Sequence, residues 1–263
     1  MTPRLIRRIT TSTRLVVGVA ALTPSGALAQ TFDVKGLDVT RGALELGLDN
    51  TAHAGAPARR DGNRSAHDQS LDYGVTDRWR LSGVLKLENP WQDDVRIAKS
   101  AVENLFVLRA PPKDGGTGLG WFTAIEWSLD QATTNSSVFG PIIALQAGKL
   151  SFAVNPFLEK TFGRNRVEGI ALTYGWNAKY QLNEALAVGL EGFGLIENLG
   201  DPRPLSGQEH RIGPALFATL KITDELTITP DVGVFFGLTQ ATPDVTLKLN
   251  VGIPLSQPSQ LRK

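Results

Sequence analysis

Apolar and polar residues alternate along most of the chain beyond about residue 40. In Leu172–Leu182 the even-numbered positions are Leu, Tyr, Trp, Ala, Tyr and Leu, whereas the odd-numbered positions are small or polar. A period of two places successive side chains on opposite sides of a strand. The pattern therefore predicts strands with one apolar face and one polar or charged face. The same alternation recurs at 79–88, 151–159, 211–222, 226–239 and 245–255.

The alternating segments predict about twelve strands. Glycine is abundant, with 27 residues, and the chain has 11 Phe and 5 Trp, a composition that suits many strands joined by turns. The predicted strands cover residues 41–53, 66–75, 78–88, 95–109, 119–129, 137–147, 150–159, 169–182, 185–197, 209–222, 226–239 and 245–255.

The connections between these segments alternate in length. Thr76–Asp77, Gly148–Lys149, Asn183–Glu184 and Thr223–Glu225 are tight turns. Short turns at one end and long loops at the other are typical of outer-membrane barrels, whose short turns are periplasmic. The connection 110–118 is an exception, since it is long but falls among the short turns. The long polar loops are 54–65, 89–94, 130–136, 160–168, 198–208 and 240–244.

Together these features predict an all-β fold, an antiparallel up-and-down transmembrane β-barrel over residues 41–255. Beyond the first 30 residues no run of 18 apolar residues occurs, which excludes a helical membrane protein. A soluble β-sandwich with an aromatic core is the alternative, but a sandwich does not explain the alternating loop lengths.

The first 29 residues have the pattern of a signal peptide. Arginines precede the short apolar run Leu15–Leu22, and Ala27-Leu28-Ala29 forms an A-x-A cleavage site. This stretch holds four of the 27 basic residues and no acid, so removing it changes the formal charge from +1 to −3. We expect residues 30–40 to form a periplasmic N-terminal segment and residues 256–263 a periplasmic C-terminal tail.

Composition excludes several chemistries. The chain has no cysteine, which excludes disulfides, thiolate metal sites and a cysteine nucleophile. Its near-neutral charge argues against a nucleic-acid partner. The glycine-rich stretch 110–120 lacks the Gly-Lys-Ser/Thr of a phosphate loop, so we interpret it as a turn. We expect no cofactor and no metal site, because pairs such as His67-Asp68 and Glu209-His210 lack metal-ligand spacing.

Aromatic residues mark one end of the predicted barrel. Tyr73, Trp79, Trp121 and Tyr180 fall on outward faces, near the tight turns. Tyr and Trp are enriched where a barrel meets the membrane–water interface. We therefore predict that these four residues form a girdle.

The opposite faces of the strands carry many charges of both signs. A packed core tolerates so much charge only when it is paired or hydrated, so the lumen is either a polar channel or a plug of paired charges. A strongly selective pore would show a run of one sign, and this chain does not. The predicted lumen-facing charged residues are Glu45, Asp49, Asp72, Arg80, Lys86, Glu88, Glu126, Glu159, Lys179, Glu191, Arg211, Lys221, Asp231 and Lys248.

Three histidines leave an enzyme as a further alternative. His53, His67 and His210 lie near the predicted extracellular rim, and three serines are close to them in sequence: Ser65, Ser70 and Ser206. A serine–histidine pair is the basis of a hydrolase or deacylase. Rim histidines are more often simply solvated, so we predict no enzymatic activity and no catalytic residue.

With its A-x-A site, its strands of period two and its closing strand 245–255, the chain resembles the transmembrane β-barrels of Gram-negative outer membranes. In the segment Leu71–Trp79 the chain is similar to a group of barrel proteins that are related to channels of aromatic-degradation pathways. The resemblance implies an outer-membrane location, with lipids and the barrel-assembly machinery as partners. Such barrels usually end in an aromatic residue, and this chain ends Ser-Gln-Pro-Ser-Gln-Leu-Arg-Lys.

Twelve strands should enclose a narrow lumen, since eight leave no channel and sixteen leave a wide one. We therefore expect a narrow porin-like channel for small polar solutes. A rim-active lipid hydrolase and a non-conducting structural or docking barrel are the alternatives.

Overall fold

The computed structural model describes residues 31–55, 63–91, 94–112, 115–223 and 226–256. The signal peptide 1–29 and the tail after Ser256 lie outside these ranges. Strands dominate the described ranges, and one 3-10 helix lies in a loop. The elements are β1 (Leu44–Ala54), β2 (Asn63–Thr76), β3 (Trp79–Pro90), β4 (Arg96–Arg109), β5 (Gly116–Ser128), β6 (Asn135–Ala147), β7 (Leu150–Phe162), β8 (Ala171–Asn183), β9 (Leu186–Ile196), η1 (Leu205–Gly207), β10 (Glu209–Ala218), β11 (Leu220–Lys221), β12 (Thr227–Gly237) and β13 (Val245–Ser256).

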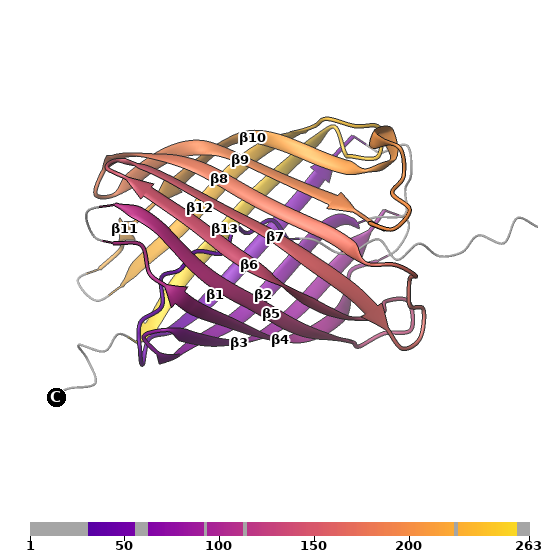
Figure 1. Cartoon of the computed structure of the whole chain (residues 1–263), viewed down its shortest axis with the longest axis horizontal. Coiled ribbons are helices and arrows are strands. Elements are labelled where there is room, and N and C mark those ends of the chain that lie inside the picture. The colour runs from indigo at the N-terminus through magenta and orange to yellow at the C-terminus, as the bar shows by residue number, and fades with distance from the viewer. Residues whose placement is uncertain (1–30, 56–62, 92–93, 113–114, 224–225, 257–263) are drawn as a thin grey trace, which may run out of the picture.

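The strands form one closed antiparallel barrel (Figure 1). β1 pairs with β2 on one side and with β13 on the other, which closes the sheet. Because β10 and β11 both pair with β12 and only Thr219 separates them, they are two parts of one barrel strand. The barrel therefore has twelve strands, as the alternation predicts. Closure pairs the strand edges that an open sheet would leave exposed. The sandwich alternative is wrong, because the strands form one closed sheet.

The two ends of the barrel differ. The turns 77–78, 148–149 and 184–185 lie at one end, which we call the short-turn end. The connections 129–134, 163–170 and 197–208 lie at the other, the long-loop end. The predicted alternation of connection lengths is thus present in the structure.

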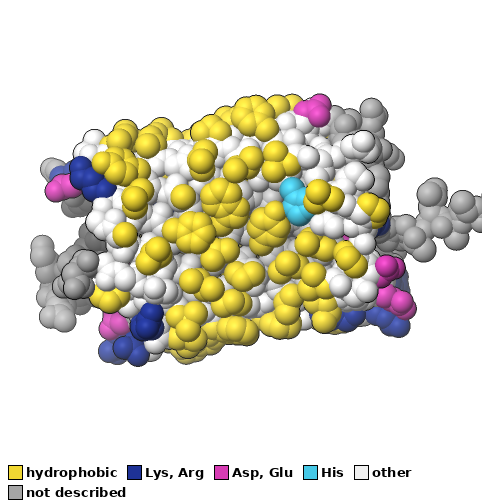
Figure 2. Space-filling view, turned by 45° about the horizontal axis from the view of Figure 1, so that its top comes forward, with side chains coloured by type: hydrophobic (Ala, Val, Ile, Leu, Met, Phe, Trp, Pro, Cys, Tyr) yellow, Lys and Arg dark blue, Asp and Glu magenta, His cyan; other side chains and the backbone are white. Residues whose placement is uncertain are grey.

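The outer surface of the barrel is apolar. Figure 2 shows hydrophobic side chains across the middle of one face, with charged side chains gathered toward the two ends. Leu71, Leu190 and Leu247 on three different strands are each about half exposed, at 48%, 48% and 51%. Soluble monomers rarely expose apolar surface over such an extent, so this band has the character of a lipid-facing surface.

Across the described ranges, no helix has the length and apolar character that a bilayer span requires.

Residues 31–40 lie inside the barrel. The backbone carbonyl of Phe32 accepts a hydrogen bond from Asn250 Nδ2 at 3.0 Å, and that of Lys35 accepts one from Asn155 Nδ2 at 3.2 Å. Both asparagines are buried inward positions of the wall. At the short-turn end the segment leaves the lumen near Arg41, whose backbone N–H donates to Asp77 Oδ1 at 3.1 Å. The structure therefore places residues 31–40 in the lumen and not in the periplasm. We call residues 31–40 the luminal segment.

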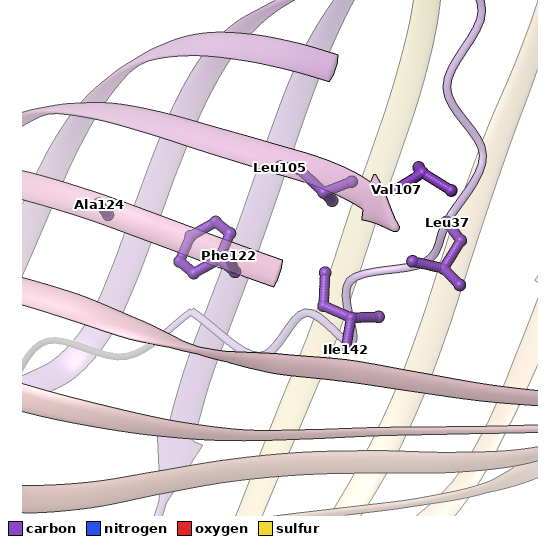
Figure 3. Close-up of a cluster of buried hydrophobic side chains, with 6 residues drawn as sticks. All are labelled: Leu37, Leu105, Val107, Phe122, Ala124 and Ile142. Carbon is purple, nitrogen blue, oxygen red and sulfur yellow. The ribbon is translucent and has the colours of Figure 1, made fainter. Parts of the chain in front are cut away.

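Apolar side chains explain why this segment packs inside. Leu37 packs with Leu105, Val107, Phe122, Ala124 and Ile142 on the inner wall (Figure 3). Phe32, with Val34 against it, packs with Phe193 and Phe235 nearer the long-loop end. Burying a side chain such as Phe or Leu stabilises the folded state by about 1.5–3 kcal/mol. A segment in the periplasm would leave this surface in water.

Glycines in β5 make room for the luminal segment. A Cβ atom at Gly118 or Gly120 would lie 2.6 or 2.5 Å from a methyl carbon of Leu37. A side chain at either position would therefore clash with the segment. The interpretation of 110–120 as a turn is accordingly wrong at its end, since β5 begins at Gly116.

Candidate functional site

The lumen contains nearly all the charged side chains that strand parity assigns to it. Asp49, Lys86, Glu126 and Glu159 line a cavity of about 140 Å³ between the luminal segment and the wall. Glu45, Asp72 and Arg80 line a second cavity, of about 360 Å³, at the short-turn end. Contacts described below pair or bury six more of these inward charges, those of Glu88, Lys179, Glu191, Arg211, Asp231 and Lys248.

Lys221 is the exception. It lies opposite Thr227 at the short-turn end of the strand, where its side chain is exposed. Its parity in the strand is that of the inward positions, but the barrel wall ends there. Parity therefore assigns the face of a side chain and not its depth in the lumen.

Glu126 is the centre of one charge cluster. Its carboxylate contacts Lys86 Nζ at 2.8 Å and Lys99 Nζ at 2.9 Å, and it accepts a hydrogen bond from Ser136 Oγ at 2.8 Å. Lys86 Nζ also lies 3.4 Å from Asp68 Oδ2. Five neighbouring strands, β2 to β6, thus contribute to one network of alternating charges, in which each ammonium faces at least one carboxylate.

The luminal segment joins this network. Thr31 Oγ1 donates to Asp68 Oδ2 at 2.8 Å, and Lys35 Nζ lies 3.4 Å from Glu103 Oε2. Lys35 also pairs with Asp33 of its own segment at 3.1 Å. The segment is therefore held by ion pairs and hydrogen bonds as well as by its apolar side chains.

Lys248 is the centre of a second cluster, on the opposite part of the wall. Its ammonium donates to Glu191 and to Asp231, the latter at 2.6 Å. Its side chain is fully buried, as is that of Glu191. Lys179 Nζ lies 3.7 Å from the centre of the Phe217 ring, where a cation–π contact partly replaces hydration.

Arg211 fixes the luminal segment near the long-loop end. Its guanidinium carbon lies 4.3 Å from the centre of the Phe32 ring, and Nη1 donates to Thr246 Oγ1 at 3.1 Å. The same guanidinium pairs with Glu209. Phe32 is therefore held between a cation and the rings of Phe193 and Phe235.

At the long-loop rim, Arg96 joins the wall to a loop. It pairs with Glu88 Oε2 at 3.1 Å and with Asp130 Oδ2 at 2.9 Å. Partial burial opposes ionisation of Asp130, but hydrogen bonds from the backbone and hydroxyl of Thr133 outweigh it and lower the pKa of Asp130. The ionised carboxylate of Asp130, paired with Arg96, thereby attaches the loop 129–134 to the end of the wall.

The sequence prediction missed several charged residues of the lumen: Asp33, Lys35, Asp68, Lys99 and Glu103. Asp68 and Glu103 share the parity of residues that face inward, so parity could have found them. Lys99 has the same parity as Glu103 on β4, so parity could have found it too, although a register shift between β3 and β4 lies beside it. Asp33 and Lys35 carry no such signal, since they precede the first strand.

The 140 Å³ cavity has an excess of acidic side chains. Its lining includes the carboxylates of Asp33, Asp49, Asp68, Glu103, Glu126 and Glu159 and only three ammonium groups, those of Lys35, Lys86 and Lys99. Such a lining favours hydrated cations over anions. Within the described ranges, no group of three or more His, Asp or Glu side chains is arranged to hold a metal ion.

The four aromatic residues predicted to form a girdle lie near the short-turn end. Tyr73, Trp121 and Tyr180 are 46%, 39% and 44% exposed, and Trp79 is partly exposed. Phe106 pairs with both Trp79 and Trp121, so three aromatic side chains lie in one row across β3, β4 and β5. This placement is what an interfacial belt requires.

The three histidines have different surroundings. His53 faces the lumen, where its Nδ1 lies 2.9 Å from Thr246 Oγ1. His210 contacts Tyr174 and Gln208. His67 contacts Ser65, so one of the three nearby serines is brought to a histidine. Ser70 lines the lumen cavity instead, and Ser206 lies in η1.

No protein-family model matches the chain, and no curated protein matches it. Solved structures do. The COG4313 outer membrane channel from Pseudomonas putida F1 aligns with a TM-score of 0.59 and 11% identity over 85% of this chain and 100% of that one. The KdgM porin aligns with a TM-score of 0.51 and 11% identity over 81% and 99%. The NanC porin aligns with 0.50 and 12% over 81% and 100%.

At these identities the likeness shows a shared fold. The chain is thus a twelve-stranded barrel of the architecture found in outer-membrane porins and channels.

Proposed function

We propose that this protein is a narrow porin-like channel of an outer membrane that passes small polar solutes. The acidic cavity inside a closed twelve-stranded wall is the observation that supports this proposal most strongly. The apolar outer band and the likeness to outer-membrane channels support the same location. In this proposal the short-turn end is periplasmic and the long loops are extracellular.

The proposal assigns the luminal segment a role in limiting passage. It lies across the lumen and occupies space between the walls that small solutes would otherwise use. The segment carries two carboxylates and one ammonium, so it also contributes to the charge of the path. Lipids of the membrane and the machinery that assembles barrels are the partners that such a protein needs.

Solute passage can be tested by liposome swelling. Liposomes containing the purified protein should swell faster in isosmotic arabinose than protein-free liposomes do. Cationic lysine should enter faster than anionic glutamate of similar size, because carboxylates exceed ammonium groups in the cavity lining.

A matched pair of variants separates the cavity from the rest of the surface. Glu103→Gln removes one carboxylate of the cavity lining and should lower the lysine-to-glutamate ratio of swelling rates. Asp201→Asn changes an exposed loop residue and should leave the ratio unchanged. Absence of swelling in both wild type and a variant lacking residues 31–40 would contradict the proposal and favour a non-conducting barrel.

A further inference from the structure

A serine, a histidine and an asparagine form a hydrogen-bonded chain on the outer face of the barrel. His67 Nε2 lies 3.1 Å from Ser65 Oγ, and His67 Nδ1 lies 2.9 Å from Asn50 Oδ1. Ser65 and His67 are two residues apart on β2, so both point to the same side. Asn50, on the neighbouring strand β1, lies directly opposite His67. The three side chains are partly exposed.

The hydrogen bonds of Asn50 determine the tautomer of His67. Asn50 Nδ2 donates to the backbone carbonyl of Leu249 at 3.0 Å and to that of Leu48 at 3.3 Å. The amide oxygen of Asn50 therefore faces His67 and must accept, so Nδ1 of the imidazole carries the proton. Nε2 then has a free lone pair and accepts from the hydroxyl of Ser65. This is the protonation pattern in which a histidine can act as a general base toward a serine.

From this chain we propose that Ser65, His67 and Asn50 form the catalytic site of a hydrolase for carboxylic esters of lipids. This activity is separate from the proposed channel, because the three side chains lie on the outer face and the charge clusters on the inner one. His67 and the inward-facing Asp68 are adjacent in sequence but on opposite faces of β2.

The surroundings favour a lipid as substrate. Asn50 pairs with Leu249 of β13, which is 48% exposed, and His67 pairs with Leu87 of β3. The polar chain is thus set among outward leucines, where acyl chains of a membrane would lie. Polar side chains on such a surface are costly unless they bond to one another or serve a function.

A cation lies on the same strand pair. The pairing of β2 with β3 has a register shift between Asn63 and Ser65, at the exposed Arg64. Arg64 Nη2 donates to Asn89 Oδ1 at 3.1 Å. Asn89 is on β3 and lies directly opposite Ser65 in the pairing of β2 with β3. A guanidinium held there can stabilise the negative charge of a tetrahedral intermediate or of a lipid headgroup.

The reaction proceeds in two steps. In the first, His67 Nε2 takes the hydroxyl proton as Ser65 Oγ attacks the carbonyl carbon of the ester. The bond from carbon to the alcohol oxygen then breaks, and His67 returns the proton to that oxygen. In the second, His67 takes a proton from water, the hydroxide attacks the acyl carbon, and the bond to Ser65 Oγ breaks as Oγ regains a proton.

A fluorophosphonate probe tests the site directly, since it forms a covalent bond with an activated serine. The purified full-length barrel in detergent should be labelled, with the modification on Ser65 by mass spectrometry. Ser65→Ala should abolish labelling and the hydrolysis of a p-nitrophenyl acyl ester. His67→Ala should slow hydrolysis by a factor of about 10³, and Asn50→Ala, which removes only the orienting group, by a smaller factor.

Two control variants match these changes. Ser70→Ala alters a serine of the same strand that faces the lumen, and His210→Ala alters a histidine whose contacts are Tyr174 and Gln208. Both should retain labelling and hydrolysis. An unlabelled wild-type protein that runs as a folded barrel on a cold SDS gel would overturn the proposal, as would labelling that persists in Ser65→Ala. Ser65→Ala leaves the lumen unchanged, so this variant should still pass solutes if the channel proposal is correct. Loss of hydrolysis with solute passage retained shows that the two activities are separate, and absence of solute passage counts against the channel alone.

Discussion

The buried ammonium of Lys248 depends on its two carboxylate partners. The lysine is inaccessible to water and lies between Glu191 and Asp231. Its positive charge stabilises both carboxylates in place of the water that they would contact in solution. Removing one member of a buried ion pair leaves the others uncompensated, which costs more than the pair itself contributes.

We predict that Lys248→Met destabilises the barrel by about 3–5 kcal/mol. The cost arises because the Glu191 carboxylate, which is also fully buried, would lose its counter-charge. The measurement is the urea concentration at which the protein loses its cold SDS-resistant form. Lys149→Ala changes an exposed lysine in a tight turn and should leave the midpoint unchanged. An equal midpoint for Lys248→Met and wild type would refute this account of the cluster.

At the scale of single residues, parity within a strand was the informative signal. It assigns Glu126, Glu191 and Lys248 to the lumen without reference to any contact. It could not find the partners of a charge, because ion pairs such as Lys86 with Glu126 join residues from different strands. The Ser65–His67 contact was within reach of the sequence, since an i, i+2 pair on a strand shares one face. The contribution of Asn50 was not, because it depends on the register of β1 against β2.

Strands and the luminal segment differed in how far they could be predicted. Long segments of period two, such as β8 and β13, were predicted to within a few residues because one apolar face repeats over many positions. In β4 and β5 the inner wall carries Leu105, Val107 and Phe122, which pack on Leu37, so both faces contain apolar residues and the alternation weakens. The luminal segment is too short to show a period. Its place depends on contacts with residues more than 200 positions away, such as Asn250.

The outward face of each strand should tolerate charge poorly. Leu190 lies in the middle of β9 and is 48% exposed on the apolar band. We predict that Leu190→Arg destabilises the barrel in lipid vesicles by about 2–4 kcal/mol, since a charge there would face hydrocarbon. Urea unfolding in vesicles measures the change. The matched variant Leu238→Arg, at a position 62% exposed just after β12, should have a much smaller effect. Similar effects for both variants would contradict a lipid-facing position for Leu190.

At the scale of the whole molecule, the barrel combines two surfaces with different tasks. The outer surface is apolar and faces lipid in the proposed location, while the inner surface carries paired charges with an excess of acid. The sequence left a channel and a polar plug as alternatives for the lumen. The structure contains features of both, because the charges pair across the wall and the luminal segment lies among them, beside cavities of about 140 and 360 Å³. The central claim is therefore that the barrel is a channel and that residues 31–40 limit it.

Single-channel recording in planar bilayers tests this claim most directly. Wild-type protein should show a small unit conductance, and a variant in which Gln30 is joined to Arg41 should show a larger one with a preference for cations. The double variant Phe32→Ser/Leu37→Ser, which keeps the segment but removes its two anchors, should fluctuate between the two levels. Equal unit conductance in all three proteins, or no conductance in any of them, would contradict the claim.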